Sequence, residues 1–381
     1  MEPDFLSKAE SKFLFAAFSL ILRELDKKAD TLVYFPIFLD ATCSGIQHFS
    51  ALLKDLDLGN KVNLKKQTDI DKVEDIYSEM VEPINKAINA HGQENHDFVS
   101  LSLVKLNRKL LKPLIMTKLY NSTPFGMAQQ LKSNLIKEKS SLHTKLLKDL
   151  KYQVPGKDGI LLLNNFEIFK IGQIVHEQIF KLYPSLKAIY SYFIDIVRLM
   201  INLNIPVIWI TPSGLKITQS YARSTLNKVA INMAGKTKSM VLREWTDNLD
   251  KGKQIQAIIP NIIHSLDASH LINLLCLAEN EKFKPIISIH DCFGTHPNKL
   301  EDLSFMVKRE FVLLYTRSNF LQTFQKRILQ SIKDNQYLIE DDKENKSQFI
   351  ILNRKKHYIP EIPKLGSLDL KNILESRYMI T

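Results

Sequence analysis

The spacing of apolar residues along the chain predicts a mainly helical protein. Apolar positions recur every three or four residues in six segments, a spacing that places them on one face of an α-helix. These segments are residues 7–26, 70–90, 101–120, 170–202, 261–279 and 299–333. The most apolar stretch, residues 13–22, is too short to span a bilayer, and we expect it to form a buried helix.

Short β-rich segments interrupt the helical pattern. They are residues 32–39, the segments on either side of His290-Asp291, and residues 205–219, whose Pro- and Gly-containing turn is typical of a hairpin. The fold class that we expect is therefore α+β, mainly α-helical with a small antiparallel β-sheet. Residues 137–165 contain several lysines and a Pro155-Gly156 turn, and we interpret them as an exposed insertion.

The composition of the chain indicates which kind of partner the protein binds. The 381 residues, 45% of them hydrophobic, suffice for a core divided between two or three lobes. Lys and Arg outnumber Asp and Glu by 52 to 41, and the net charge of +11 favours polyanions such as nucleic acid. The abundance of Lys, Ile and Asn is typical of an A/T-rich genome, such as that of an organelle or its plasmids.

Cysteine usage and the N-terminal residues bear on the compartment. The cysteines Cys43, Cys276 and Cys292 include no Cys-x-x-Cys pair, so neither a disulfide framework nor a zinc ribbon is indicated, and a reducing compartment is expected. Glu2 and Asp4 stand where a signal peptide carries positive charge, and no Arg-rich transit segment is visible. A mitochondrial location therefore implies synthesis inside the organelle or a longer N-terminus, and we expect no membrane partner.

Two aspartates that follow β-rich segments form a candidate metal site. Asp40 ends an apolar strand and Asp291 lies at a hairpin tip, so neighbouring strands of one sheet can bring them together. Hard cations such as magnesium prefer carboxylate oxygens, and two ions about 3.5 to 4 Å apart can activate a hydroxyl and stabilise a leaving pyrophosphate. A single aspartate after a strand is more commonly a turn residue, so the spacing alone leaves both interpretations open.

A row of four side chains, which includes two cations and a phenol, recurs every fourth residue and so lies along one face of a helix. The row consists of Arg108, Lys112, Met116 and Tyr120. Two cations can hold a triphosphate by charge while a tyrosine contacts the sugar and base. A solvated amphipathic helix explains the spacing equally well. Pro113 is tolerated best in a first turn, and we therefore expect the helix to begin near Leu111.

Three motifs, in this order, closely resemble those of the single-subunit RNA polymerases of bacteriophages and mitochondria. They are Asp40-Ala-Thr-Cys-Ser-Gly-Ile-Gln-His48 for the first palm motif, Arg108-x-x-x-Lys112-x-x-x-Met116-Thr-x-x-Tyr120 with Phe125-Gly126 for the fingers motif, and Ile289-His-Asp291-Cys-Phe-Gly-Thr295 for the second palm motif. Further resemblance covers Trp209-x-x-Pro-x-Gly214 and residues 260–270 and 366–376. Nearly the whole chain is covered.

The resemblance implies a DNA-directed RNA polymerase core that adds ribonucleoside triphosphates to an RNA 3′-hydroxyl on a DNA template. It assigns two magnesium ions to Asp40 and Asp291, and the nucleotide triphosphate to Arg108 and Lys112. It also makes Lys112 the proton donor to pyrophosphate. The implied partners are the DNA template, the RNA–DNA hybrid and the nucleotides, with a missing N-terminal polypeptide or an accessory factor as a further one.

The resemblance assigns further residues around this centre. Tyr120 would select ribonucleotides over deoxyribonucleotides, Tyr77 would lie near the nucleotide, and His264 would lie beside the nascent pair or hybrid. We expect His270 and His290 to be hydrogen-bonded structural histidines. The active-site floor would be shaped by Gly45, Gln47 and His48.

The implied architecture is a right-hand polymerase. We expect the palm at residues 1–70 and 265–381 and the fingers at residues 71–264, with the N-terminal domain and the thumb absent. The chain departs from the family pattern at Ala41 and Asn121, where Gly is usual, and at Pro113. Because Asn tolerates a left-handed backbone, we expect the turn at Asn121 to be kept.

Two other interpretations remain open. A DNA polymerase of the related right-hand class also uses two palm aspartates, but it usually has an acidic residue directly after its His-Asp, where this chain has Cys292. The other is an inactive or split-gene remnant that binds nucleic acid without turnover.

Overall fold

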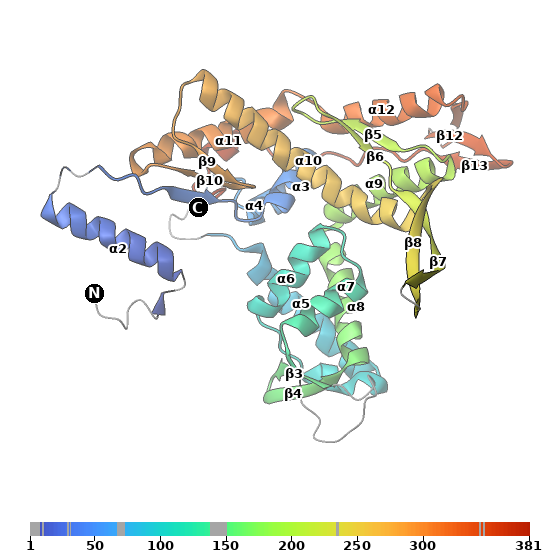
Figure 1. Ribbon diagram of the computed structural model, residues 1–381, viewed down its shortest axis with the longest axis horizontal. Helices are drawn as coiled ribbons and strands as arrows, with labels where there is room; N and C mark the ends of the chain where they lie inside the picture. The colour runs from blue at the N-terminus through green and yellow to red at the C-terminus, as the bar shows by residue number, and fades with distance from the viewer. Residues whose placement is uncertain are drawn as a thin grey trace.

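The computed structural model describes residues 8–381 apart from residues 10, 29, 31, 67–72, 138–150, 234–235, 343 and 346. Helices dominate and the sheets are small and antiparallel, which confirms the α+β class. Figure 1 shows an upper body, which holds the chain's C-terminus, above a smaller lower lobe. Among the described residues, no helix is long and apolar enough to cross a membrane.

A three-stranded antiparallel sheet in the upper body joins distant parts of the chain. Strand β10 (Cys292–Thr295) lies between β1 (Ile37–Asp40) and β9 (Ile287–Ile289). Helices α3 (Ser44–Leu53), α10 (Lys251–Asn280) and α11 (Leu300–Thr316) pack around it. The strands beside His290-Asp291 are confirmed, whereas the predicted strand at 32–39 is shorter and begins at Ile37.

The rest of the upper body surrounds this centre. It contains α4 (Leu56–Lys61), α9 (Pro184–Asn202), the hairpin of β5 (Val207–Ile210) and β6 (Lys216–Gln219), η3 (Pro297–Lys299), α12 (Phe320–Asp334), the sheet of β11 (Glu340–Asp342), β12 (Ser347–Leu352) and β13 (Lys355–Tyr358), and η4 (Leu370–Glu375). The predicted hairpin at 205–219 is confirmed. Its Trp209 is fully buried and packs on Phe324, which also meets Phe193 edge to face at 5.3 Å.

The lower lobe is a helical bundle with a small sheet at its end (Figure 1). Its elements are α5 (Ile76–Glu94), η1 (His96–Leu103), α6 (Arg108–Leu119), α7 (Pro124–Ser133), β2 (Ile136–Lys137), β3 (Lys151–Gly156), β4 (Gly159–Asn164) and α8 (Asn165–Leu182). The predicted exposed insertion at 137–165 is partly wrong. Its residues 138–150 lie outside the described part, but Tyr152 and Val154 of β3 are buried, and the Pro155-Gly156 pair belongs to that strand.

Three predicted helices are each divided by a local signal. The segment 101–120 consists of the end of η1 and of α6, because the side chain of Asn107 accepts a hydrogen bond from the amide of Leu110 at 3.0 Å and caps a helix there. That helix therefore begins at Arg108 and not near Leu111, with Pro113 inside it. In the same way 170–202 divides before Pro184, and 299–333 divides between α11 and α12.

The expectation of a buried N-terminal helix is wrong. Residues 13–22 belong to α2 (Lys12–Lys27), but none of its described residues is buried, and the side chain of Phe13 is 92% exposed. Helix α2 projects from the body in Figure 1. The apolar face that the spacing predicts is present, yet no described element of this chain covers it.

A long hairpin between β7 (Ala222–Met233) and β8 (Lys236–Leu249) was missed by the sequence analysis. It projects from the end of the upper body in Figure 1. Large apolar side chains such as Leu226 and Trp245 are more than half exposed along it. Because the hairpin is exposed over most of its length, it lacks the alternation of buried and polar positions that identifies a strand.

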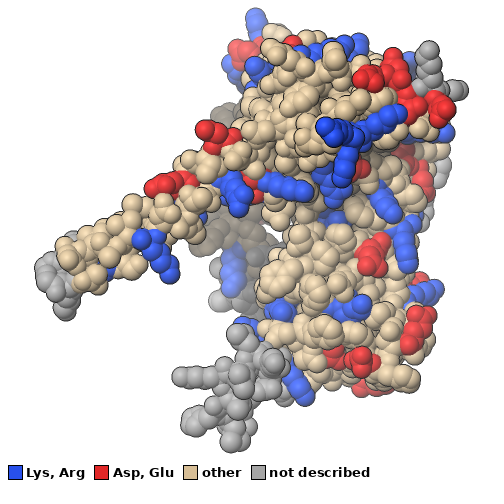
Figure 2. Space-filling model, turned by 90° about the vertical axis from the view of Figure 1, so that its right-hand side faces the viewer, with Lys and Arg blue, Asp and Glu red and all other residues tan. Residues whose placement is uncertain are grey.

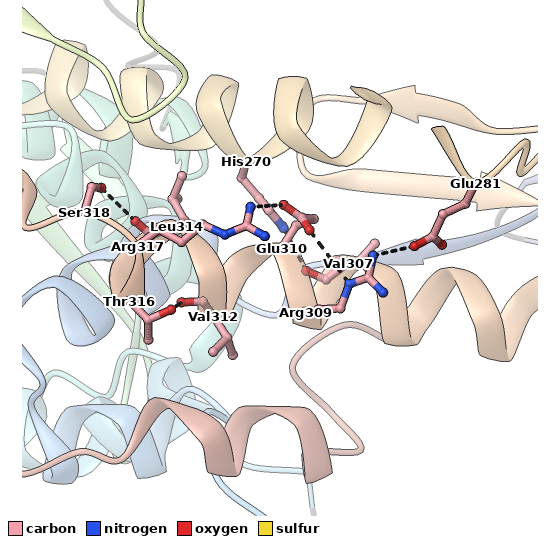
Figure 3. A network of polar contacts seen from close by, with 10 residues as sticks. All are labelled: His270, Glu281, Val307, Arg309, Glu310, Val312, Leu314, Thr316, Arg317 and Ser318. Carbon is pink, nitrogen blue, oxygen red and sulfur yellow. Dashed lines mark hydrogen bonds and ion pairs between the residues drawn. The ribbon is translucent and has the colours of Figure 1, made fainter. Parts of the chain in front are cut away.

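Helix α10, which runs the length of the upper body, is tied to α11 by polar contacts (Figure 3). His270 Nε2 lies 2.9 Å from the carbonyl of Val307, in agreement with the expected structural role of this histidine. Beside it, the buried carboxylate of Glu310 lies 3.8 Å from Arg309 Nε, and Arg309 Nη2 donates to Glu281 at 2.7 Å. These contacts fix the helix on which His264 is carried.

A buried lysine fastens α6 inside the lower lobe. Lys118 is 2% exposed, its Nζ lies 2.7 Å from His176 Nε2 and 4.2 Å from the ring centroid of Phe180. Burial lowers the pKa of Lys118 to about 8 and that of His176 to about 4. Both side chains are thus destabilised in their charged forms by the surrounding core.

This burial predicts a pH-dependent contribution to stability. Because the pKa of Lys118 is lower in the folded chain, the unfolded chain binds more protons there between about pH 8 and 10.5, and stability rises with pH across that window. Relative to Lys118→Met, the wild type should gain about 1 kcal/mol of unfolding free energy from pH 7 to pH 9. Urea denaturation of both proteins at pH 7 and pH 9 measures this difference. An equal change in unfolding free energy for the wild type and the variant would contradict the lowered pKa of Lys118.

Candidate active site

The central sheet brings two distant aspartates together. Strand β1 ends at Asp40, which pairs in register with Cys292 of β10. Asp291 precedes Cys292 in the tight turn of the β9–β10 hairpin, where His290 is exposed and has a left-handed φ of 55°. Asp40, at the end of β1, and Asp291, in the turn that leads into the adjacent strand β10, therefore line the same cavity.

This cavity, of about 250 Å³, also receives the cationic helix. It is lined by Asp40, Ala41, Thr42, Cys43, Ser44, Gly45 and Asp291 of the sheet and α3 region, by Tyr77 of α5, and by Lys112, Met116, Leu119 and Tyr120 of α6 and its C-terminal end. Three members of the row of four predicted from the spacing thus line one cavity with both aspartates. The fourth, Arg108, lines a neighbouring cavity that shares Tyr77.

The carboxylates concentrate negative charge. Burial raises the pKa of Asp291, and the charges of Asp267 and Asp40 raise it further, although a hydrogen bond with Ser44 opposes them. Within the described part of the chain, no group of three or more His, Cys, Asp or Glu side chains is placed to hold a metal ion. Magnesium is usually held by one or two protein carboxylates, with phosphates and water completing its shell, so this pair fits that ion.

Tyr77 lies close to both cations and to Cys43, the N-cap residue of α3. Its ring centroid is 5.4 Å from Lys112 Nζ and 6.0 Å from Arg108 Cζ, and its hydroxyl is 3.0 Å from Cys43 Sγ. Burial raises the pKa of Tyr77 well above its ordinary value, so the hydroxyl stays protonated. Opposed carboxylates and ammonium or guanidinium groups across one cavity can bind a metal-complexed polyphosphate.

Tyr120 closes another side of the cavity. Its ring lies 5.4 Å from that of His264 on α10, measured between centroids. Burial and the negative charges of Asp267 and Asp291 raise the pKa of Tyr120 to about 12, so it keeps its hydroxyl proton. Asn121, which follows, has a left-handed φ of 63° and donates to the carbonyl of Ile255 at 3.0 Å. The prediction that this turn is kept despite the loss of Gly is confirmed.

Two residues expected at the floor lie beneath the cavity. Gly45 lines it, whereas Gln47 and His48 are buried in the layer below. His48 Nε2 lies 2.7 Å from Asp267 Oδ1, and its Nδ1 makes a short hydrogen bond with the hydroxyl of Tyr315. Asp267, on α10, therefore links this layer to the helix of His264, a role that sequence reasoning missed although the residue stands in the quoted motif 260–270.

The last residues of the chain also support the site. Gln47 Nε2 lies 2.9 Å from the carbonyl of Met379 and 3.0 Å from that of Val62. The backbone groups of Asp40 and Thr381 exchange two hydrogen bonds, both of 2.9 Å. Backbone contacts of this kind leave no signal in the sequence.

Basic side chains also gather on the surface between the upper body and the lower lobe. Figure 2 shows a hollow between the upper body and the lower lobe, with Lys and Arg side chains along both of its sides. Such a groove suits a polyanion.

A carboxylate pair opposite a cationic helix is an arrangement that can bind a metal-complexed nucleotide, and comparison with known proteins gives the family. Residues 2–381 match the model of the DNA-dependent RNA polymerase family, and the chain belongs to that family.

Relatives extend this assignment. The chain is 41% identical over 389 residues to a probable DNA-directed RNA polymerase of Gelasinospora sp. (strain G114), an alignment that covers 100% of this chain and 46% of that protein. It is 34% identical to a probable DNA-directed RNA polymerase of Neurospora crassa, over 84% of this chain and 36% of that protein. It is 26% identical to the mitochondrial DNA-directed RNA polymerase of Schizosaccharomyces pombe, over 98% of this chain and 32% of that protein. The chain thus spans less than half the length of these relatives.

Gln47 offers a test of the supporting layer. In Gln47→Leu the buried carbonyls of Val62 and Met379 lose their donor, and we expect the free energy of unfolding to fall by about 2 to 4 kcal/mol. Gln129→Leu, at an exposed position of α7, is the control and should change it by less than about 0.5 kcal/mol. Chemical denaturation compares the two, and equal effects would contradict the role of Gln47.

Proposed function

We propose that this chain is the catalytic core of a DNA-directed RNA polymerase. The reaction is the transfer of a ribonucleotide from its triphosphate to an RNA 3′-hydroxyl on a DNA template. The observation that carries the proposal is the convergence of Asp40 and Asp291 on one cavity with Lys112 and Tyr120. Membership of the family and the names of its relatives agree with it.

Asp40 and Asp291 hold two magnesium ions in this proposal. Held there, the ions would supply Lewis-acid chemistry, lowering the pKa of the attacking hydroxyl and neutralising charge on the leaving pyrophosphate. Lys112 binds the triphosphate and donates a proton to pyrophosphate as it leaves, and Arg108 binds the outer phosphates. The Tyr77 ring lies close to both of these cations and so restricts where the triphosphate can lie.

Tyr120 and His264 face the sugar and the nascent pair. The raised pKa of Tyr120 supports a role as a neutral hydroxyl that can sense the 2′-hydroxyl of a ribonucleotide. His264 packs on that tyrosine and lines a second groove along α10, which suits contact with the hybrid.

The two bodies suit a right-hand polymerase. In this proposal the palm comprises residues 1–70 and 265–381 and the fingers residues 71–264. Of the fingers, α5 to α8 form the lower lobe, whereas α9 and the β5–β6 hairpin lie in the upper body. The template and hybrid lie in the basic hollow between the upper body and the lower lobe (Figure 2). A further N-terminal polypeptide or an accessory factor is an additional partner in this proposal. Relatives named as mitochondrial enzymes support a mitochondrial location.

The first test removes either metal-binding carboxylate. Asp40→Ala and Asp291→Ala should each lower nucleotide addition to a primed DNA template by about a thousandfold or more, because the remaining carboxylate cannot hold the ion pair. Primer extension with purified protein and magnesium measures this loss.

Asp195→Ala, on the exposed face of α9, is the matched control and should retain full activity. Undiminished extension by either site variant would refute the metal assignment. Template binding without extension by the wild type would favour the non-catalytic remnant instead.

The second test concerns the sugar. Tyr120→Phe removes only the hydroxyl, so it should lower discrimination against deoxyribonucleotides by about tenfold while ribonucleotide addition persists. Competition between the two nucleotide types during primer extension measures the ratio. A selectivity equal to that of the wild type would count against this role of Tyr120.

A further inference from the structure

Asp75, which does not line the catalytic cavity, contacts α6, which presents Arg108 and Lys112, and caps α5, which carries Tyr77. It stands at the start of α5, where its Oδ1 accepts a hydrogen bond from the amide of Tyr77 at 3.1 Å. Its Oδ2 accepts from Arg108 Nε at 2.5 Å and from Ser78 Oγ at 2.7 Å. One carboxylate therefore caps the helix that carries Tyr77 and holds the first residue of α6.

The contact with Arg108 leaves the phosphate-binding end of the guanidinium available. Asp75 accepts the hydrogen bond of Nε–H, and within the described part of the chain Arg108 makes no other hydrogen bond or ion pair. The two terminal nitrogens can then form the paired hydrogen bonds by which arginine binds phosphate. An arginine held at Nε loses fewer side-chain conformations when it binds, so less affinity is lost to ordering.

The same contacts set the position of the Tyr77 ring. Arg108 Cζ and Lys112 Nζ lie 6.0 and 5.4 Å from its centroid, and its hydroxyl is anchored 3.0 Å from Cys43 Sγ. Burial raises the pKa of the Asp75 carboxyl, but the hydrogen bonds from Arg108 and Ser78 outweigh it and hold this pKa below its ordinary value. Asp75 is thus an anion at neutral pH.

We propose that Asp75 is a positioning residue for nucleotide binding, which orients Arg108 toward the outer phosphates of the incoming triphosphate and fixes α5 against α6. The inference rests on the proposed polymerase function and adds a residue to its substrate site. Asp75 itself touches neither the nucleotide nor the metal ions. Its effect is on substrate affinity and not on the chemical step.

The test separates the charge of Asp75 from its capping role. Asn and Ser both cap helices well, so Asp75→Asn and Asp75→Ser keep an acceptor for the Tyr77 amide but lose the ion pair with Arg108. The wild type and both variants are bound to a DNA template with an RNA primer that ends in a 3′-deoxynucleotide, so that no addition occurs. Titration with the next complementary ribonucleoside triphosphate then gives its Kd.

We expect Kd to rise about threefold to tenfold in both variants. Primer extension with an ordinary primer should show a raised KM with little change in kcat. Glu82→Gln, which breaks the exposed Glu82–Lys86 pair of 2.7 Å on the same helix, is the matched control and should leave Kd unchanged.

A double-mutant cycle decides whether the effect passes through Arg108. In the Arg108→Gln background, Asp75→Asn should have no further effect on Kd. An equal rise in that background would assign the effect to the helix cap and overturn the inference, as would an unchanged or lower Kd in both single variants. Failure of the wild type to bind the nucleotide would instead overturn the proposed function itself.

Discussion

The antiparallel pairing of β1 with β10 is the constraint on which the site depends. Side chains alternate between the two faces of a strand, so a shift of one residue in this register would turn Asp40 away from Asp291. The backbone of Asp40 is held on its other side by Thr381, and the Gln47 amide ties the next helix to Met379. Backbone hydrogen bonds, which do not depend on the site's charge, therefore hold two carboxylates in a position that mutual repulsion alone would disfavour.

The opposite wall of the cavity carries positive charge, and it is held in place by contacts within the lower lobe. Helix α6 begins at the Asn107 cap, and its buried Lys118 contacts His176 in the lower lobe. These contacts fix the position of α6, so that Lys112 and Tyr120 face the sheet. The site lies where the upper body meets the lower lobe. The chemistry that we propose thus requires both the register of the sheet and the placement of α6 against it, because phosphoryl transfer depends on positioning.

Much of the fold follows from local patterns. The helical spacing of α5 and α10, the β5–β6 hairpin and the strands around Asp291 were predicted, because periodicity and turn residues act over a few positions. The cap at Asn107 and the break before Pro184 were also readable from their residue types, although the spacing alone joined the helices across them. The exposure of α2 and of the β7–β8 hairpin was not predictable, since amphipathic spacing does not say what covers an apolar face.

The sequence by itself determined which residues we propose for the chemistry, because three motifs with defined spacing name the aspartates, the cations and the tyrosine. Only the tertiary structure decided which of them meet. It placed Gly45 at the cavity but Gln47 and His48 beneath it, put Arg108 in a neighbouring cavity, and brought in Asp267 and Asp75. These outcomes depend on contacts between residues far apart in the chain, and the direction of a side chain across such a contact is set by packing, which local periodicity does not encode.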